Sequence, residues 1–462
     1  MTTLATPRTG RRASASAAAL ALPSAATLLA LMNYTAPMAV LDETARGLHA
    51  GGTARIWLMS AISLGLAAAL LAAGSLADDH GRRRVFVIGA AALAASSVAC
   101  AAAPTALVFV AGRIVQGAAS AALLAAGLGI IAASTEPGPR RAHATGIWGA
   151  MLGLGIALGP IATAGLTAAG GWRLWYWTTV AASLLLAGVA ERTLAESRAA
   201  RPRGLDLPGL LTLGLGVAAL LAAVTWGRTG WTRPAVLALF AVAAVLLAAF
   251  AAVEARRREP MLDLALFRRP AFLLSITGAL VTGLAVIGVM SYLATVMALV
   301  LGLSPLAAAS VLAIWSGLSF LAALQARRLP ARLSAGRLLG AGLALSAIGE
   351  VAMLGLAPGG HWWRLVPGLV VAGVGSGLAN AMLARLAVGS VPADRAGMGS
   401  GANNTARYIG AALGIAIVGA IATGQGTGPS ALAHGANAAM LASAAVAALG
   451  AALAFAIPDR SA

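Results

Sequence analysis

The sequence predicts an all-α membrane protein that crosses a bilayer fourteen times. Of its 462 residues, 60% are hydrophobic and only 10% are charged, whereas soluble domains are about 45–50% apolar and about 25% charged. Mean hydropathy is +0.88. The apolar residues fall into runs that reach the length of about 20 residues that a spanning helix needs. These observations exclude a soluble enzyme, a disordered chain and a free nucleic-acid binder.

We expect every span to be helical, because lipid offers the backbone no hydrogen-bond partner. Barrel strands of about ten alternating residues do not fit such long runs. The first run follows a short basic stretch, but the many runs after it favour a retained span over a signal peptide. The expected spans are Ala19–Val40, Arg55–Ala77, Arg84–Ala102, Thr105–Ser134, Ala142–Ala168, Arg173–Ala190, Leu207–Trp226, Pro234–Val253, Pro270–Leu301, Leu306–Ala326, Ser334–Leu356, Arg364–Gly389, Gly397–Thr423 and His434–Ile457.

The charge distribution predicts the orientation of the chain. All 32 basic residues are arginine, the net charge is +18, and most arginines lie in alternate loops and at the termini. The positive-inside rule places these loops and both termini in the cytoplasm of a multi-pass cell-membrane protein. Because spans separate the basic clusters, we expect lipid and no nucleic acid as partner. Abundant alanine and arginine without lysine indicate the genome of a GC-rich bacterium.

The longest basic linkers flank the seventh and eighth spans, which leaves six spans before this pair and six after it. We therefore expect two six-helix bundles and a two-helix central insert. Gly81-Arg82 and Gly336-Arg337, at corresponding loops of the two bundles, form a faint repeat. Transporters built this way bind substrate near the midplane between the two halves. The expected divisions are a tail at 1–18, a bundle at 19–190, the linker and insert at 191–269, a bundle at 270–457 and a tail at 458–462.

The loop between the second and third spans carries the strongest motif, which includes Gly74, Asp78, Gly81, Arg82 and Arg83. Topology alone explains the arginines but not the glycines and the aspartate. The stretch resembles the signature loop of the major facilitator superfamily, Gly-x-Leu-Ala-Asp-x-x-Gly-Arg-Arg/Lys. The resemblance implies a loop that helps to close a cytoplasmic gate.

Position 79 departs from this family pattern. Asp79 stands where the family usually has a basic residue. We therefore expect a weaker latch at this gate than the family pattern implies.

Two further motifs lie inside the fourth and fifth spans. Arg113, with Gln116 and Gly117, resembles the superfamily's fourth-helix motif, which is linked there to proton coupling; the alternative is a structural arginine bonded to carbonyl groups. Gly155, Gly159 and Pro160 resemble the fifth-helix motif of the superfamily's exporters, where a kink is thought to restrict leak. Glycines four residues apart otherwise indicate only close helix packing.

Segments around the insert and late in the chain indicate which family within the superfamily the chain resembles. They are Gly204–Gly209, Trp226–Trp231, Pro260–Phe267 and Val391–Gly397, followed by Arg407 and Gly410. Together they resemble the fourteen-helix drug:proton antiporter family. This resemblance covers nearly the whole chain and implies a monomeric transporter, without cofactor, that exports a drug-like or amphipathic molecule in exchange for protons by alternating access.

The first span departs from that family, because Asn33 occupies the position at which an acidic residue is usual. The remaining acid within a span is Glu350. Intramembrane acids often serve proton relays, so Glu350 and Arg113 are the candidates for proton coupling. The alternatives for Glu350 are a structural pair with an arginine and a frayed helix end.

The candidate substrate cavity combines polar and aromatic residues from several spans, although helix packing is an alternative for each of them. Within the spans, arginines outnumber acidic residues. This excess of positive charge favours a neutral or anionic substrate. The candidates are Asn33, Tyr34, Gln116, Tyr292, Trp315, Asn403 and Arg407.

Other functions have less support from the sequence. An uncoupled facilitator or importer of the same fold is the main alternative, since the acid of the first span is missing. A membrane enzyme or receptor would need a polar catalytic cluster or a large soluble domain. Without lysine the chain contains no ATP-binding P-loop. Cys100 is the single cysteine, and the five histidines show no metal-ligand spacing, so we expect no metal.

Overall fold

The computed structural model describes residues 9–199, 206–227, 230–257, 260–329, 333–424, 426 and 428–457. Every secondary-structure element in these ranges is helical, and fourteen helices or helix combinations are long and apolar enough to cross a membrane. The α-helices are α1 (Thr9–Thr35), α2 (Leu41–Gly47), α3 (Gly52–His80), α4 (Arg82–Ala101), α5 (Ala106–Ser134), α6 (Pro139–Gly170), α7 (Arg173–Thr193), α8 (Leu207–Gly227), α9 (Pro234–Arg256), α10 (Pro270–Val281), α11 (Gly288–Leu301), α12 (Pro305–Gln325), α13 (Ala335–Ala352), α14 (Val366–Gly389), α15 (Ala396–Thr423) and α16 (Pro429–Ala456).

Each expected span corresponds to one candidate membrane span. The bounds differ at several ends, and one span has an irregular segment in its middle. The eleventh expected span is too long, because α13 ends at Ala352 and Gly355 adopts φ +93° soon after it. The ninth span contains α10 and α11 joined by a π-helix at Thr282–Ile287. The short helix α2 lies in an expected loop. Hydropathy reports none of these local changes in hydrogen bonding.

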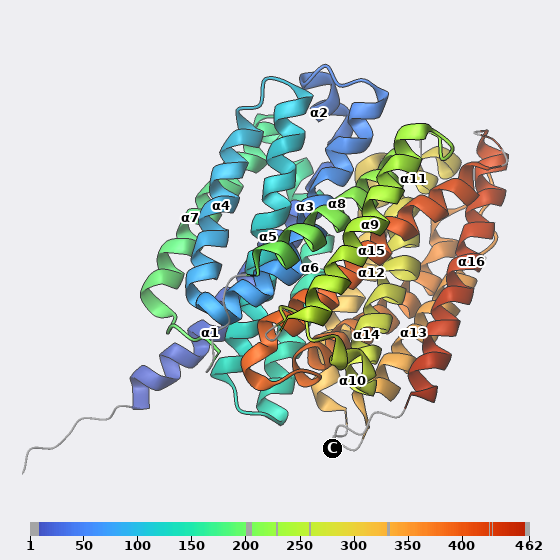
Figure 1. Cartoon of the computed structure of the whole chain (residues 1–462). Coiled ribbons are helices and arrows are strands. Elements are labelled where there is room, and N and C mark those ends of the chain that lie inside the picture. The colour runs from blue at the N-terminus through green and yellow to red at the C-terminus, as the bar shows by residue number, and fades with distance from the viewer. Residues whose placement is uncertain are drawn as a thin grey trace, which may run out of the picture.

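The helices pack in two groups with α8 and α9 beside them (Figure 1). Among the N-terminal helices, α1 to α7, α3 packs on α5, α4 on α5 and α7, and α1 on α6. Among the C-terminal helices, α10 to α16, α13 packs on α14 and α16, and α15 on the π-helix. Helix α8 packs on α9 and also contacts α3 and α15. In the most apolar stretch of α9, only 17% of the residues are buried within the protein. Helix α9 therefore lies at the periphery.

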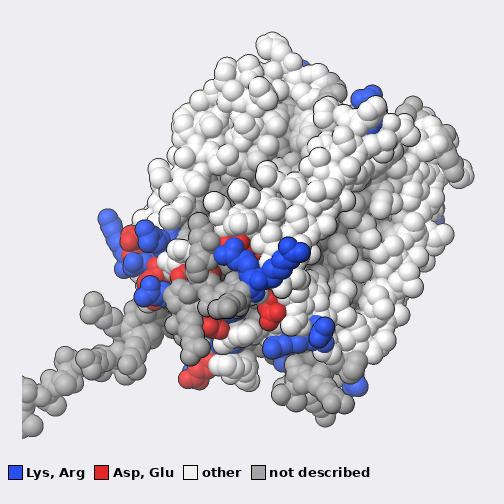
Figure 2. Space-filling view, in the orientation of Figure 1, with Lys and Arg blue, Asp and Glu red and all other residues white. Residues whose placement is uncertain are grey.

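Charged side chains gather at one end of the helices (Figure 2). This end, which we call the Arg-rich end, carries the connections α3–α4, α5–α6, α7–α8, α9–α10, α12–α13 and α14–α15. Helix α1 begins and α16 ends there (Figure 1). We call the other end the opposite end. Its exposed tryptophans suit an interface between lipid and water: Trp177, Trp226, Trp231, Trp362 and Trp363.

Candidate functional site

The turn between α3 and α4 consists of Gly81 alone. Its φ of +114° is one that residues with a Cβ rarely adopt. A Cβ there would also lie 2.7 Å from the carboxylate of Glu196. That carboxylate accepts hydrogen bonds from the backbone N–H groups of Arg83 and Arg84, at 3.0 and 3.1 Å. Glu196 therefore caps the start of α4 and ties the linker after α7 to this turn.

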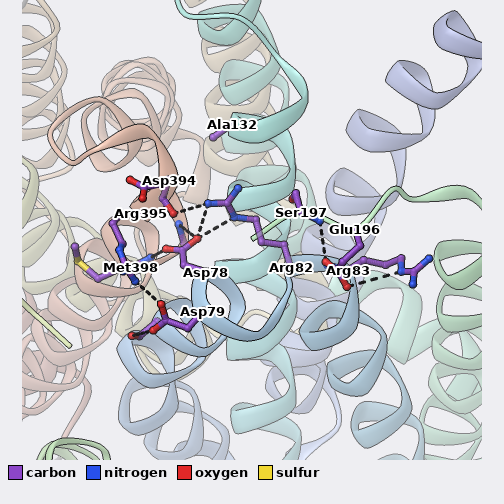
Figure 3. Close-up of polar contacts among 12 residues, drawn as sticks. Asp78, Asp79, Arg82, Arg83, Ala132, Glu196, Ser197, Asp394, Arg395 and Met398 are labelled. Atoms are coloured by element: carbon purple, nitrogen blue, oxygen red, sulfur yellow. Dashed lines mark hydrogen bonds and ion pairs between the residues drawn. The ribbon is translucent and has the colours of Figure 1, made fainter. Parts of the chain in front are cut away.

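Asp78 joins the N-terminal and C-terminal helices at the Arg-rich end (Figure 3). Its fully buried carboxylate forms an ion pair with Arg82 at 2.8 Å. It also accepts hydrogen bonds from the backbone N–H groups of Gly397 and Met398, at 3.1 and 2.8 Å. These N–H groups open α15, where a negative charge is favourable. An acid at the end of α3 thus caps a helix more than 300 residues away in the chain.

Arg82 and Asp79 add two contacts to the same junction (Figure 3). Arg82 donates to the backbone oxygen of Asp394 at 2.8 Å. Asp79 forms an ion pair with Arg395 at 2.5 Å, and both side chains are only 7% exposed. Although the sequence suggested a weaker latch here, the structure gives Asp79 its own partner among the C-terminal helices. We call Asp78, Asp79, Arg82, Asp394 and Arg395 the closing cluster.

Close backbone packing accompanies the closing cluster. A Cβ on Gly74 would lie 2.2 Å from the backbone oxygen of Gly397, and a Cβ on Gly401 would lie 2.4 Å from that of Leu70. Helices α3 and α15 therefore touch through their backbones. Arg83 lies outside this contact, since its partners Glu191 and Glu196 belong to α7 and the following linker.

The opposite end holds a cavity between the same two groups of helices, with about 660 Å³ of empty space that includes a part open to solvent. The cavity is lined from α1 and the turn after it, from α6, from the π-helix and α11, and from α12. The lining residues are Tyr34, Thr35, Met38, Ile156, Ala157, Pro160, Ile287, Met290, Ser291, Ala294, Ala309, Leu312, Ala313, Trp315 and Ser316.

Arg113 is fully buried in a polar network behind this cavity. Its Nη1 donates to the backbone and side-chain oxygens of Asn33, at 2.9 and 3.2 Å, and to Gln116 Oε1 at 3.0 Å. Trp175 donates to the same Asn33 side-chain oxygen at 3.3 Å. Gln116 donates onward to Ser97 at 2.8 Å. Neither Asn33 nor Gln116 is among the residues that line the cavity.

Glu350 is fully buried in α13, and both of its carboxyl oxygens lack a hydrogen-bond partner within the described ranges. No described arginine forms an ion pair with it. The polar side chain beside it is Ser443 of α16. The Ser443 hydroxyl donates to the backbone oxygen of Ala285, in the π-helix, at 2.8 Å. Because Ile287 and Met290 follow Ala285 and line the cavity, a short chain of contacts connects Glu350 to the cavity wall.

The other candidate residues lie around α15 and α11. Buried Arg407 donates to Asn404 and, at 3.3 Å, to Asn380, while Asn403 donates to Ser275 at 2.8 Å. The ring of Tyr408 lies 5.6 Å from that of Tyr34. Two aromatic side chains therefore contact each other between the two groups of helices. Tyr292 packs among apolar residues. Of these, only Tyr34 lines the cavity.

Helix α6 presents glycines to three neighbouring helices. Gly149 and Gly153 face α14 and α12, while Gly155 and Gly159 face α1. A Cβ on Gly159 would lie 2.2 Å from Thr35 Oγ1 and 2.6 Å from a backbone oxygen of α1. Close approach therefore explains these glycines, and Pro160 beside them lines the cavity.

We expect Gly159→Ala to lower the stability of the purified protein by about 1–3 kcal/mol, because α1 and α6 must separate. Thermal unfolding in one detergent measures this change. Gly165→Ala is the matched control, since it lies on the same helix with open space around it and alanine favours helix by about 1 kcal/mol. Equal or higher stability of the Gly159 variant would show that this contact is not tight.

Residues 24–415 match the family model described as Major Facilitator Superfamily. The chain is 30% identical to multidrug resistance protein Stp of Mycobacterium tuberculosis, over 82% of this chain and 71% of that protein. It is 31% identical to multidrug efflux pump LfrA of Mycolicibacterium smegmatis, over 91% and 83%. It is also 31% identical to the puromycin resistance protein pur8 of Streptomyces alboniger, over 89% and 84%.

Solved structures show the same fold at lower sequence identity. The human organic anion transporter MFSD10 superposes with a TM-score of 0.68 at 16% identity, over 97% of this chain and all of that chain. The proton:xylose symporter XylE superposes with a TM-score of 0.69 at 13% identity, over 97% of both chains. The arrangement of helices is therefore that of these two transporters.

Proposed function

The chain belongs to the major facilitator superfamily, and from this premise we propose that it exports a drug-like or amphipathic molecule in exchange for protons by alternating access. Its relatives are multidrug and antibiotic efflux transporters, so the chain is a multi-pass membrane transporter and not an enzyme. Our proposal adds three points to this: protons drive transport, the substrate moves outward, and particular residues carry the coupling.

One observation carries the alternating-access proposal. The closing cluster holds the N-terminal and C-terminal helices together at the Arg-rich end, while the cavity separates them at the opposite end. In our proposal this is one of two alternating states. The Arg-rich end, with both termini, faces the cytoplasm, so the cavity opens outward. Breaking the closing cluster then opens the cytoplasmic side for loading.

The proposed domain organisation follows the same contacts. Residues 19–190 and 270–457 form the two bundles that move, residues 191–269 form the linker and insert, and 1–18 and 458–462 are the tails. Both bundles contribute to the cavity within one chain. We therefore propose that the protein works as a monomer in the bilayer.

Glu350 is the proposed proton carrier. It is a buried acid without an ion-pair partner among the described residues, and such groups mark proton pathways. Its connection through Ser443 and the π-helix to the cavity wall supports this role. Arg113 is the second coupling candidate, because its Nε and Nη2 are buried and no described residue accepts a hydrogen bond from them.

Transport into inverted membrane vesicles tests the proposed function. We expect a panel of fluorescent amphiphiles to include molecules that accumulate when the vesicle interior is acidified. We expect this accumulation to collapse on addition of a protonophore. Vesicles without the protein are the control. Equilibration of the same molecules at an equal rate with and without a gradient would contradict antiport and favour an uncoupled facilitator.

A further inference from the structure

The cavity lining contains no arginine, lysine, histidine, aspartate or glutamate. Ten of its fifteen lining residues are methionine, isoleucine, leucine, alanine or proline. An ion that enters such a space leaves water without a counter-charge, which costs several kcal/mol. The lining therefore disfavours charged occupants of either sign.

The charges behind the lining weigh further against a cation. Arg113 binds Asn33, which precedes cavity residue Tyr34 in the chain. Arg407 precedes Tyr408, whose ring contacts Tyr34. Glu350 lies on α13, which contributes no residue to the lining. Arg113 and Arg407 thus lie next to residues that contact or adjoin Tyr34, whereas Glu350 is connected to the cavity wall through Ser443 and the π-helix.

Most buried polar side chains of the lining are satisfied within the protein. The Tyr34 hydroxyl accepts a hydrogen bond from Ser63 at 3.2 Å. Thr35 donates to the backbone oxygen of Leu31 at 3.1 Å. Ser316 donates to the backbone oxygen of Leu312 at 3.4 Å.

Trp315 is the exception among these buried groups. Its side chain lines the cavity and the residue is only 5% exposed, yet its Nε1–H has no acceptor within the described ranges. A buried donor without a partner is costly and calls for an explanation. A hydrogen-bond acceptor on a bound molecule would satisfy it.

We propose that the cavity binds an uncharged, largely aromatic or aliphatic molecule whose oxygen accepts a hydrogen bond from Trp315 Nε1. This inference deepens the proposed function, because it takes the cavity as the substrate site. It does not depend on proton coupling. Trp315 is then the residue that separates molecules with an acceptor from equally apolar molecules without one.

Three probes of similar bulk test the proposal by equilibrium binding. They are triphenylphosphine oxide, which is neutral with a strong acceptor oxygen, triphenylphosphine, which is neutral without it, and tetraphenylphosphonium, which is a cation. The purified full-length protein in lipid nanodiscs is titrated with each probe, and the rise in unfolding temperature gives its affinity. We expect triphenylphosphine oxide to bind most tightly.

Trp315→Phe removes the donor and keeps an aromatic ring. We expect it to weaken triphenylphosphine oxide binding about tenfold, or about 1.4 kcal/mol, and to leave triphenylphosphine binding unchanged. Trp148→Phe is the matched control, because Trp148 is also buried, its Nε1 likewise has no acceptor in the described part of the chain, and it lies outside the cavity lining.

Three results would overturn the proposal. They are equal or tighter binding of tetraphenylphosphonium, an unchanged affinity in the Trp315 variant, and no binding of triphenylphosphine oxide up to its solubility limit. Because no gradient is applied, these results are independent of proton-driven transport. If vesicles accumulated only cationic molecules under a proton gradient, the proposed antiport would be supported. The proposal of an uncharged substrate would then be wrong.

Discussion

Replacing Glu350 with glutamine is expected to abolish proton-driven accumulation while substrate binding persists. One proton driven by one pH unit and 100 mV supplies about 3.7 kcal/mol. This energy sustains a concentration ratio of roughly 500 for a neutral substrate. Glutamine keeps the size of the side chain but cannot exchange a proton, so the ratio in the variant should approach one.

The measurement is the accumulation ratio of a transported dye in inverted vesicles at a fixed proton gradient. Glu350→Asp retains a carboxyl group and should restore part of the accumulation. Glu254→Gln is the matched control, because Glu254 is also buried but accepts a hydrogen bond from the backbone of Leu262, at 3.0 Å. A Glu350→Gln variant that keeps its full accumulation ratio would rule out Glu350 as the required carrier.

Sequence reasoning succeeded where the determining forces are local. Span length and hydropathy specify the fourteen membrane helices, because burial in lipid depends on each segment alone. The fold class follows from these spans and from the resemblance, and the family comparison confirms it. The signals of the α3–α4 loop were also local, since Gly81 and Asp78 stand at fixed positions in one short motif.

The partners of that loop could not be predicted in the same way. Arg395 and Asp394 lie more than 300 residues from the residues that they contact, so no local pattern links them. The contact of Asn33 with Arg113, between residues 80 positions apart, is likewise not visible in a local pattern. The π-helix at Thr282–Ile287 has no signal in hydropathy. Glu196 was missed because a lone linker glutamate resembles any solvated charge.

Removing the charge of Asp78 is expected to shift the protein toward the state that is open at the Arg-rich end. Asp78→Asn breaks a buried ion pair and leaves Arg82 without its counter-charge, which costs about 3–5 kcal/mol in such pairs. The equilibrium between the two states should therefore shift by roughly 10²–10⁴-fold. Asp42→Asn is the matched control, because its pair with Arg55 at the opposite end is exposed and contributes about 0–1 kcal/mol.

Spin labels across the Arg-rich end measure this shift. Exposed positions Arg84 and Arg337, on α4 and α13, can carry the labels as cysteines after Cys100, the chain's single cysteine, is replaced by serine. Pulsed electron paramagnetic resonance then reports the distance distribution between them. We expect a longer distance to dominate in Asp78→Asn, and the parent distribution to remain in Asp42→Asn.

The pair of Asp79 and Arg395 provides a sharper test, because its charges can be exchanged. Asp79→Arg alone places two cations in a buried contact, so it should open the Arg-rich end and reduce accumulation in vesicles. Adding Arg395→Asp restores one charge of each sign across the same contact. The double variant should therefore recover a large part of both the short distance and the transport. If each single exchange left the distance distribution unchanged, this ion pair would have no part in closing the transporter; if the double variant stayed open, charge complementarity would not be what holds the two groups of helices together.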